Sequence, residues 1–190
     1  MRLGFVGSTN PIKGLKVLLR ELQLIKDRMN VEVHIFGLTY DENLFKEFPR
    51  LLDYYHDRII FHGRFGRDVE SLKSVYENID VLVFASICEE NAPLVVREAL
   101  MTGTPVLASN LGGVPEIVVD GKNGLLFDPR VEGDLSRKIE NLITNKELRL
   151  CLLKGAKETV VLDIDGHAAQ IANLYVKLIE RYSGKKQLEL

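Results

Sequence analysis

Short apolar runs alternate with longer amphipathic stretches along this chain. Six of the runs are rich in β-branched residues and are bounded by glycine, proline or polar residues, which predicts strands. The six predicted strands are Leu3–Val6, Val31–Phe36, Arg58–His62, Val81–Ala85, Pro105–Ala108 and Gly124–Phe127. Several of them are almost entirely apolar, as expected when helices cover both faces of a sheet.

The stretches between the strands carry a helical period. Between Gly14 and Met29, leucine and isoleucine recur at spacings of three and four, which places them on one helix face. Five further helices are predicted over Glu42–Tyr54, Val69–Asn78, Pro93–Thr102, Glu132–Thr144 and Ala168–Tyr182. Strands that alternate with helices indicate βαβ units. The sequence therefore predicts an α/β fold with a doubly wound, Rossmann-like parallel sheet.

The chain shows no internal repeat and no low-complexity segment. Its 190 residues are enough to bury one substantial core, and the predicted linkers are short. We therefore expect one domain over residues 1–182. The last segment, residues 183–190, is polar and basic and is expected to be a disordered tail.

Composition narrows the class of protein. Hydrophobic residues make up 46% and charged residues 27%, a balance typical of soluble globular domains. A net charge of −2 argues against a nucleic-acid partner, which normally requires a basic surface. No apolar run approaches the roughly 20 residues of a membrane span, and Met1 is not followed by the basic segment of a signal peptide. These features predict a cytoplasmic location.

Cysteine and histidine give no sign of a metal or a disulfide framework. Cys88 and Cys151 belong to no CxxC pair, and the four histidines lack metal-ligand spacing. We expect no metal site and no cofactor.

In a doubly wound sheet, ligands bind in the crevice beyond the carboxyl ends of the strands. Four loops fall at that edge and are rich in glycine, polar and charged residues. They are Gly7–Lys13, Gly63–Arg67, Ser86–Ala92 and Ser109–Val114.

The loop after the fourth strand leads into a predicted helix with a free amino end. Asn91 suits the N-cap, and Pro93 suits the first turn. The amides of Leu94 and Val95 would then point outward at the positive end of the helix dipole, where phosphate binds readily. Glu98 lies one turn later on the same face, within reach of a ribose diol of the same nucleotide.

Glu90 and Glu98 are separated by seven residues, in the string Glu-Asn-Ala-Pro-Leu-Val-Val-Arg-Glu. This segment resembles the paired-glutamate motif of the family-four retaining glycosyltransferases of the GT-B fold. The resemblance implies that Glu98 binds the nucleotide ribose. It implies a catalytic role for Glu90, which would contact the donor sugar and stabilise positive charge at the anomeric carbon. The amides of Leu94 and Val95 would hold the distal phosphate.

A second matching segment lies between the first strand and the first helix. Family members carry an arginine at the strand end and a Lys-Gly pair five residues later. Lys13 and Gly14 match the pair, but Ser8 occupies the arginine position. Arg64 or Arg67, from a neighbouring loop, could supply the missing charge to a diphosphate.

Glycines mark two further segments of the resemblance. Gly112 and Gly113 match the family's paired glycines, which implies that they lie in the donor-sugar loop. Gly63 ends a segment that is similar to the family's nucleobase-contacting strand and turn.

The resemblance implies the donor-binding, C-terminal half of a GT-B enzyme. The expected activity is transfer of a hexosyl group from a UDP- or GDP-linked sugar to a glycan or lipid-linked acceptor. The N-terminal half, which binds the acceptor, would be a separate or missing part, and any peripheral membrane contact would come through it. We expect the isolated chain to bind nucleotide sugar without transferring it.

Two alternatives remain open. The absence of arginine at position 8 is compatible with a catalytically degenerate binding or scaffold module. A different GT-B relative, such as an epimerase or a phosphorylase, is the other. A phosphorylase lacks support because no pyridoxal-phosphate lysine motif is present, and the Glu90–Glu98 spacing favours a transferase.

Overall fold

The computed structural model describes residues 1–8, 10–25, 31–55, 57–66 and 68–186. The chain divides into two compact units, Met1–Thr159 and Val160–Leu190. The predicted helix Gly14–Met29 is too long, because α1 ends at Leu22 with Gln23 as its C-cap. Residues 26–29 of that prediction lie outside the described residues, and so does Arg67.

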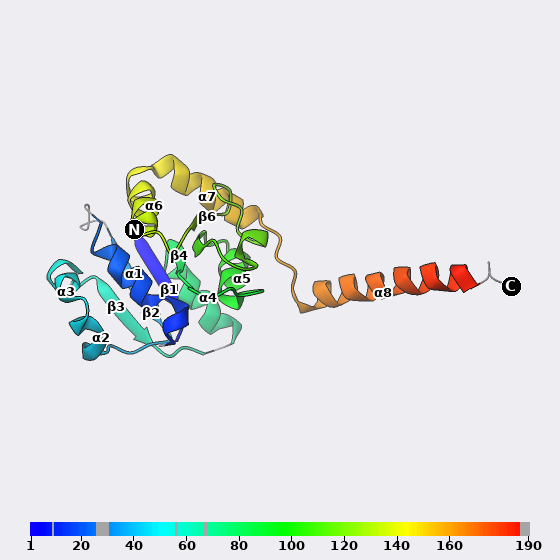
Figure 1. Ribbon diagram of the computed structural model, residues 1–190, viewed down its shortest axis with the longest axis horizontal. Coiled ribbons are helices and arrows are strands. Elements are labelled where there is room, and N and C mark those ends of the chain that lie inside the picture. Colours follow the sequence, from blue (N-terminus) through cyan, green and yellow to red (C-terminus); the bar gives the residue numbers. More distant parts are fainter. Residues whose placement is uncertain (9, 26–30, 56, 67, 187–190) are drawn as a thin grey trace. The chain divides into compact units, whose positions relative to one another are not determined.

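The first unit is built on a parallel sheet (Figure 1). Its strands are β1 (Arg2–Val6), β2 (Glu32–Phe36), β3 (Ile59–Gly63), β4 (Val81–Phe84), β5 (Val106–Ser109) and β6 (Gly124–Phe127). Their order across the sheet is β3-β2-β1-β4-β5-β6. Every predicted strand is present to within one residue at either end, and the predicted doubly wound α/β fold is confirmed.

Eight helices and two short 3₁₀ turns connect or follow the strands in the described chain. The helices are α1 (Leu15–Leu22), α2 (Glu42–Lys46), α3 (Pro49–Tyr55), α4 (Val69–Glu77), α5 (Leu94–Met101), α6 (Asp134–Thr144), α7 (Lys146–Glu158) and α8 (Ile164–Lys186). The 3₁₀ turns that concern the site are η1 (Pro11–Lys13) and η3 (Val114–Glu116).

Three helix predictions need correction. The segment Glu42–Tyr54 forms two helices because Pro49, which has no N–H to donate, starts a new one. Helix α7 was not predicted; Asn145 both ends α6 and caps α7, so no loop separates the two helices. Helix α8 extends to Lys186, so residues 183–186 of the predicted tail are helical, and residues 187–190 lie outside the described chain.

The sheet is covered on both faces. Leu3 and Phe5 of β1 belong to a buried cluster with the apolar side chains of α1 and α6. Leu82 and Phe84 of β4 are buried outside that cluster, as are Tyr76 of α4 and Val96 and Leu100 of α5. Because successive strand residues point to opposite faces, α1 and α6 cover one face, and α4 and α5 cover the other. Both faces of the central strands therefore exclude water, whereas Ile60 and His62 on the edge strand β3 are exposed.

The second unit contains α8, whereas the domain expected from the sequence runs to residue 182. The apolar side chains of α8 include Ile171 and Ile179, which are exposed in the structure. Of the described helices, none combines the length and apolarity needed to cross a bilayer.

The strand order reverses between β1 and β4, since the chain winds outward from these two strands in opposite directions. This switch point is where such sheets open a crevice at their carboxyl edge. Gly14, the N-cap of α1, lies beside it with φ of 77°. A Cβ atom at this position would lie 1.6 Å from the carbonyl oxygen of Ala85, directly after β4. Only glycine therefore allows the start of α1 to approach the end of β4.

Replacing Gly14 with alanine should destabilise the fold by about 3 kcal/mol, because a strained φ and a backbone overlap act together. Gly121→Ala is the matched control: Gly121 has a similar φ of 75°, but its added Cβ would meet nothing within 4 Å. The control should cost about 1 kcal/mol. Urea unfolding gives the free energy of unfolding of both variants. Equal losses of stability would show that the close approach of Gly14 to Ala85 adds no cost to the strained φ.

Candidate functional site

A small cavity of about 70 Å³ opens at the switch point. It lies between the carboxyl ends of β1 and β4, with one side chain from η1 and one from α5. Its lining is Phe5, Val6, Gly7, Lys13, Val83, Phe84, Ala85 and Val95. The structure thus brings Lys13 and Val95, which are far apart in the sequence, to the edge where the fold predicts a ligand.

Lys13 and Glu90 form an ion pair beside this cavity. Nζ of Lys13 lies 3.0 Å from Oε1 and 3.2 Å from Oε2 of Glu90. The hydroxyl of Ser86, which is fully buried after β4, donates to Oε1 of Glu90 at 2.8 Å. With 20% of its side chain exposed, Glu90 is shielded from most of the solvent. The two residues predicted to serve phosphate and sugar therefore neutralise each other here.

A backbone hydrogen bond fixes the loops that carry this pair. The amide of Ile87 donates to the carbonyl of Ile12 at 2.9 Å, which ties the loop after β4 to η1. Ser86 was not assigned a role from the sequence. Its position four residues before Glu90, directly after an apolar strand, is the signal that could have indicated one.

The amino end of α5 differs from its prediction. The helix begins at Leu94 with Pro93 as N-cap, and no side chain caps it. The predicted N-cap role of Asn91 is therefore wrong: Pro93 has ψ of 117°, so its backbone is still extended and Asn91 lies two residues outside the helix.

The predicted open amides are present at this helix end. The amide of Val96 donates to the carbonyl of Pro93 at 3.2 Å. Among the described residues, none accepts a hydrogen bond from the amide of Leu94 or Val95. Leu94 is 71% exposed. Two donors at the positive end of a helix dipole next to Lys13 form an environment that attracts anions.

Glu98 is half-buried on the second turn of α5. The hydroxyl of Tyr76 donates to its Oε2 at 2.7 Å and also lies 3.2 Å from the carbonyl oxygen of Val95. Burial raises the pKa of Tyr76, and the hydrogen bond to Glu98 and its charge raise it further. The phenol is therefore a permanent donor. The sequence analysis did not single out Tyr76, although a tyrosine on a buried helix face requires a partner for its hydroxyl.

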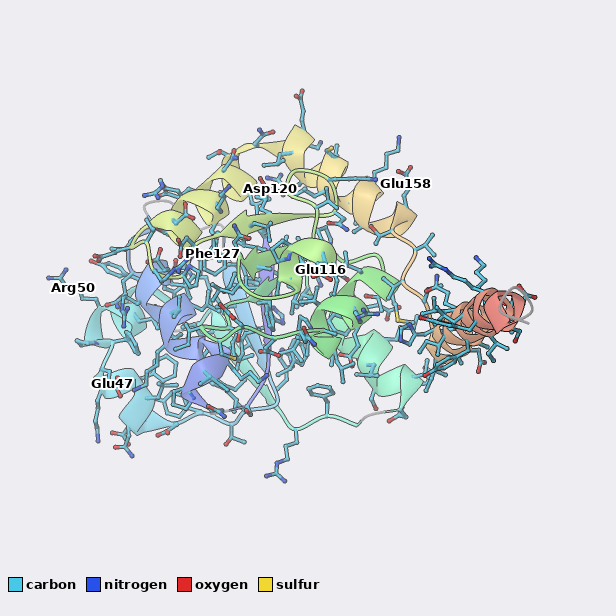
Figure 2. The ribbon with its side chains drawn as sticks, turned by 45° about the vertical axis from the view of Figure 1, so that its right-hand side comes forward. Glu47, Arg50, Glu116, Asp120, Phe127 and Glu158 are labelled. Carbon is cyan, nitrogen blue, oxygen red and sulfur yellow. The ribbon has the colours of Figure 1, made fainter. Side chains whose placement is uncertain are left out.

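The paired glycines pack against the loop that carries Glu90. The amide of Gly113 donates to the carbonyl of Glu90 at 2.8 Å. A Cβ on Gly113 would lie 2.1 Å from the carbonyl oxygen of Asn91, and Gly112 has φ of 55°. Only glycines fit this close approach. Glu116, which follows in η3, is exposed (Figure 2).

Of the predicted site residues, Lys13 and Val95 line the cavity, and the others lie outside its lining. These others include Gly63, Arg64 and Ser8. Gly63 ends β3 with φ of 68°, and its amide donates to the carbonyl of Leu38 at 3.0 Å. Arg64 follows it and is exposed. Ser8 is also exposed, and its hydroxyl accepts from the amide of Asn10 at 3.4 Å.

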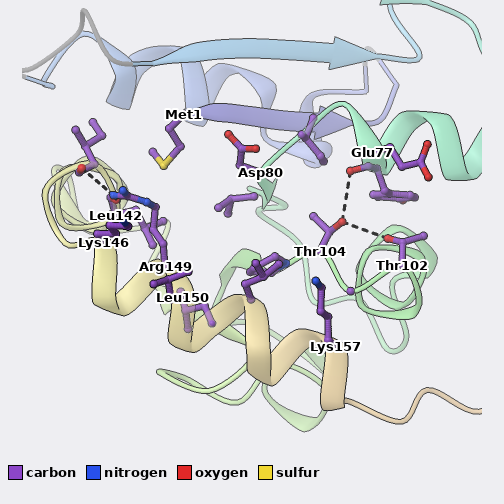
Figure 3. A pocket seen from close by; sticks show the side chains of 18 residues that line it. Met1, Glu77, Asp80, Thr102, Thr104, Leu142, Lys146, Arg149, Leu150 and Lys157 are labelled. Atoms are coloured by element: carbon purple, nitrogen blue, oxygen red, sulfur yellow. Dashed lines mark hydrogen bonds between the residues drawn. The ribbon is translucent and has the colours of Figure 1, made fainter.

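A larger cavity, of about 670 Å³, lies at the opposite edge of the sheet (Figure 3). Several of its polar side chains have protein partners. Asp80 pairs with Arg2 at 2.8 Å, and Thr104 contacts Thr102 at 3.2 Å. Arg149 donates to the carbonyl of Ile143 at 2.8 Å, at the end of α6. This cavity lies at the amino ends of the strands, away from the carboxyl edge where the fold predicts a ligand.

The family model described as "Glycosyl transferases group 1" matches residues 1–145. The chain belongs to this glycosyltransferase family. A D-inositol 3-phosphate glycosyltransferase of Corynebacterium urealyticum is 31% identical over 189 residues. That match covers 95% of this chain and 42% of the relative. The chain therefore spans less than half the length of this group 1 relative.

Solved structures agree with this assignment. The C-terminal domain of LpcC, a group 1 glycosyltransferase of Francisella tularensis, superposes with a TM-score of 0.69 at 27% identity. The match covers 84% of this chain and 83% of that domain. Anabaena HepE, solved with UDP and glucose, superposes with a TM-score of 0.75 over 93% of this chain and 48% of its own, at 22% identity. The chain thus has the fold of one half of a GT-B glycosyltransferase.

The Lys13–Glu90 pair should contribute to the stability of this glycosyltransferase domain. Lys13→Ala leaves a shielded carboxylate with Ser86 alone, and we expect a loss of about 1–2 kcal/mol in urea unfolding. Lys16→Ala is the control, since Lys16 pairs with Glu47 at 2.7 Å but both side chains are about half exposed. The control should change stability by less than about 0.5 kcal/mol. A Lys13 variant as stable as the control would mean that solvent already screens the Glu90 charge.

Proposed function

We propose that this domain binds a nucleoside diphosphate sugar, UDP- or GDP-linked, and forms the donor half of a retaining hexosyltransferase. The observation that carries the proposal is the combination of Lys13 with the open amides of Leu94 and Val95 at the switch point. One ammonium and two amides can neutralise and hold a diphosphate without a metal ion. The solved complexes of HepE with UDP and UDP-glucose lend support, since that protein shares this fold.

Each charged group would then have one task. The diphosphate is the leaving group, and Lys13 and the helix end stabilise the negative charge that develops on it. When Lys13 turns to the phosphate, Glu90 loses its ion-pair partner and retains the hydroxyl of Ser86. The freed carboxylate would stabilise positive charge at the anomeric carbon, and Glu98 would accept hydrogen bonds from the ribose.

The acceptor would be a glycan or a lipid-linked saccharide held by a second, N-terminal domain. Relatives more than twice the length of this chain support that division of labour. We infer that the isolated chain binds the donor and transfers nothing, and that the assembled enzyme works in the cytoplasm, with any membrane contact made by the other half.

Calorimetric titration with UDP-glucose and GDP-mannose tests donor binding. One of them should bind, and Glu98→Ala should weaken that binding about tenfold or more, because it removes charge-assisted hydrogen bonds to the ribose. Glu158→Ala is the control, since this exposed carboxylate lies on α7 (Figure 2) and should leave the affinity unchanged. Equal affinities of the Glu98→Ala variant and the unmodified chain would refute the role of Glu98.

Ser8 supports a second candidate, a degenerate module that has lost part of its phosphate site. Ser8→Arg restores the family's cation at an exposed position and should tighten UDP binding roughly threefold. Ser74→Arg adds the same charge to the exposed side of α4 and should have no effect. If the unmodified chain fails to bind at millimolar UDP and Ser8→Arg restores binding, the degenerate module is the better description.

A further inference from the structure

The hydrogen bond between Tyr76 and Glu98 joins two helices through one ligand-binding carboxylate. Tyr76 is 2% exposed in the last turn of α4, and its ring cannot move without disturbing the core. Its hydroxyl donates to Oε2 of Glu98 at 2.7 Å. Among the described residues, none donates to the other oxygen, Oε1. A half-buried carboxylate thus has one oxygen anchored and the other open.

We propose that Tyr76 is a positioning residue that presets Glu98 for the ribose of the nucleotide. This inference rests on the proposed function of Glu98. A glutamate side chain on a helix has several rotamers, and a ligand that fixes one of them loses affinity to the lost rotamer entropy. An anchored carboxylate has already met that cost before the ligand arrives.

The anchor is specific to the carboxylate. The alternative acceptor of Tyr76, the carbonyl of Val95, is neutral and lies farther away, at 3.2 Å. A charged acceptor at shorter distance makes the stronger hydrogen bond. The same phenol therefore couples the packing of α4 to the geometry of the ribose site on α5.

The test compares UDP with 2′,3′-dideoxy-UDP, which keeps the base and the diphosphate but lacks both ribose hydroxyls. Calorimetry on the full chain gives the two dissociation constants, and their ratio isolates the ribose contacts. The unmodified chain should prefer UDP about tenfold. In Tyr76→Phe the preference should fall at least threefold, while the affinity for dideoxy-UDP stays within twofold.

Tyr55→Phe is the matched control. Tyr55 is also fully buried, and its hydroxyl donates to the carbonyl of Leu22 at 3.3 Å. This substitution removes a buried phenolic hydroxyl of the same kind and should leave the preference for UDP unchanged. Thermal unfolding of both variants verifies that each is folded at the temperature of the titration.

A double-mutant cycle completes the test. Once Glu98→Ala has removed the preference, adding Tyr76→Phe should change nothing further. A preference that survives Tyr76→Phe but not Glu98→Ala overturns the positioning role and leaves the proposed function intact. A preference that survives Glu98→Ala, or one that is absent from the unmodified chain, shows that Glu98 does not hold the ribose, and then the positioning role and the proposed role of Glu98 both fail. Failure of the unmodified chain to bind UDP at all would instead refute the proposed donor binding.

Discussion

The contact between Gly14 and the carbonyl of Ala85 fixes the geometry on which the site depends. It sets the first helix against the end of the fourth strand, although Gly14 and Ala85 are 71 positions apart in sequence. Because η1 precedes Gly14 directly, the same contact brings Lys13 within reach of Glu90. A side chain at position 14 would move η1 outward, and the ammonium would lose its place beside the cavity. The placement of Lys13 beside Glu90 thus depends on the absence of a side chain at position 14.

Residue patterns were sufficient to predict the sheet. The central strands, which are buried on both faces, are nearly all apolar and form distinct runs, and the predicted bounds of all six strands lie within one residue of the structure. Helix ends were harder to place. Asn91 has the chemistry of a cap, but capping also requires the backbone to turn at that residue, and the extended conformation of Pro93 delays the turn. The residue types of this segment do not by themselves show at which residue the backbone becomes helical.

The contacts between side chains within the site could not be predicted from the sequence. Spacing along the chain identified Lys13, Glu90 and Glu98 separately, but gave no sign that Lys13 and Glu90 bind each other or that Tyr76 holds Glu98. Such contacts depend on which helices become neighbours in three dimensions. Helix α7 was missed for a related reason, since much of it is exposed and its buried residues include the small Gly155 and Ala156.

The Lys13–Glu90 pair has a consequence for selectivity. The neutral Lys13–Glu90 pair offers little to chloride or inorganic phosphate, because binding the ammonium would leave a carboxylate without its counter-ion. A larger ligand with a diphosphate at one end and sugar hydroxyls at the other can satisfy both groups at once. Under the proposed function, the ion pair would therefore favour a nucleotide sugar over a small inorganic anion.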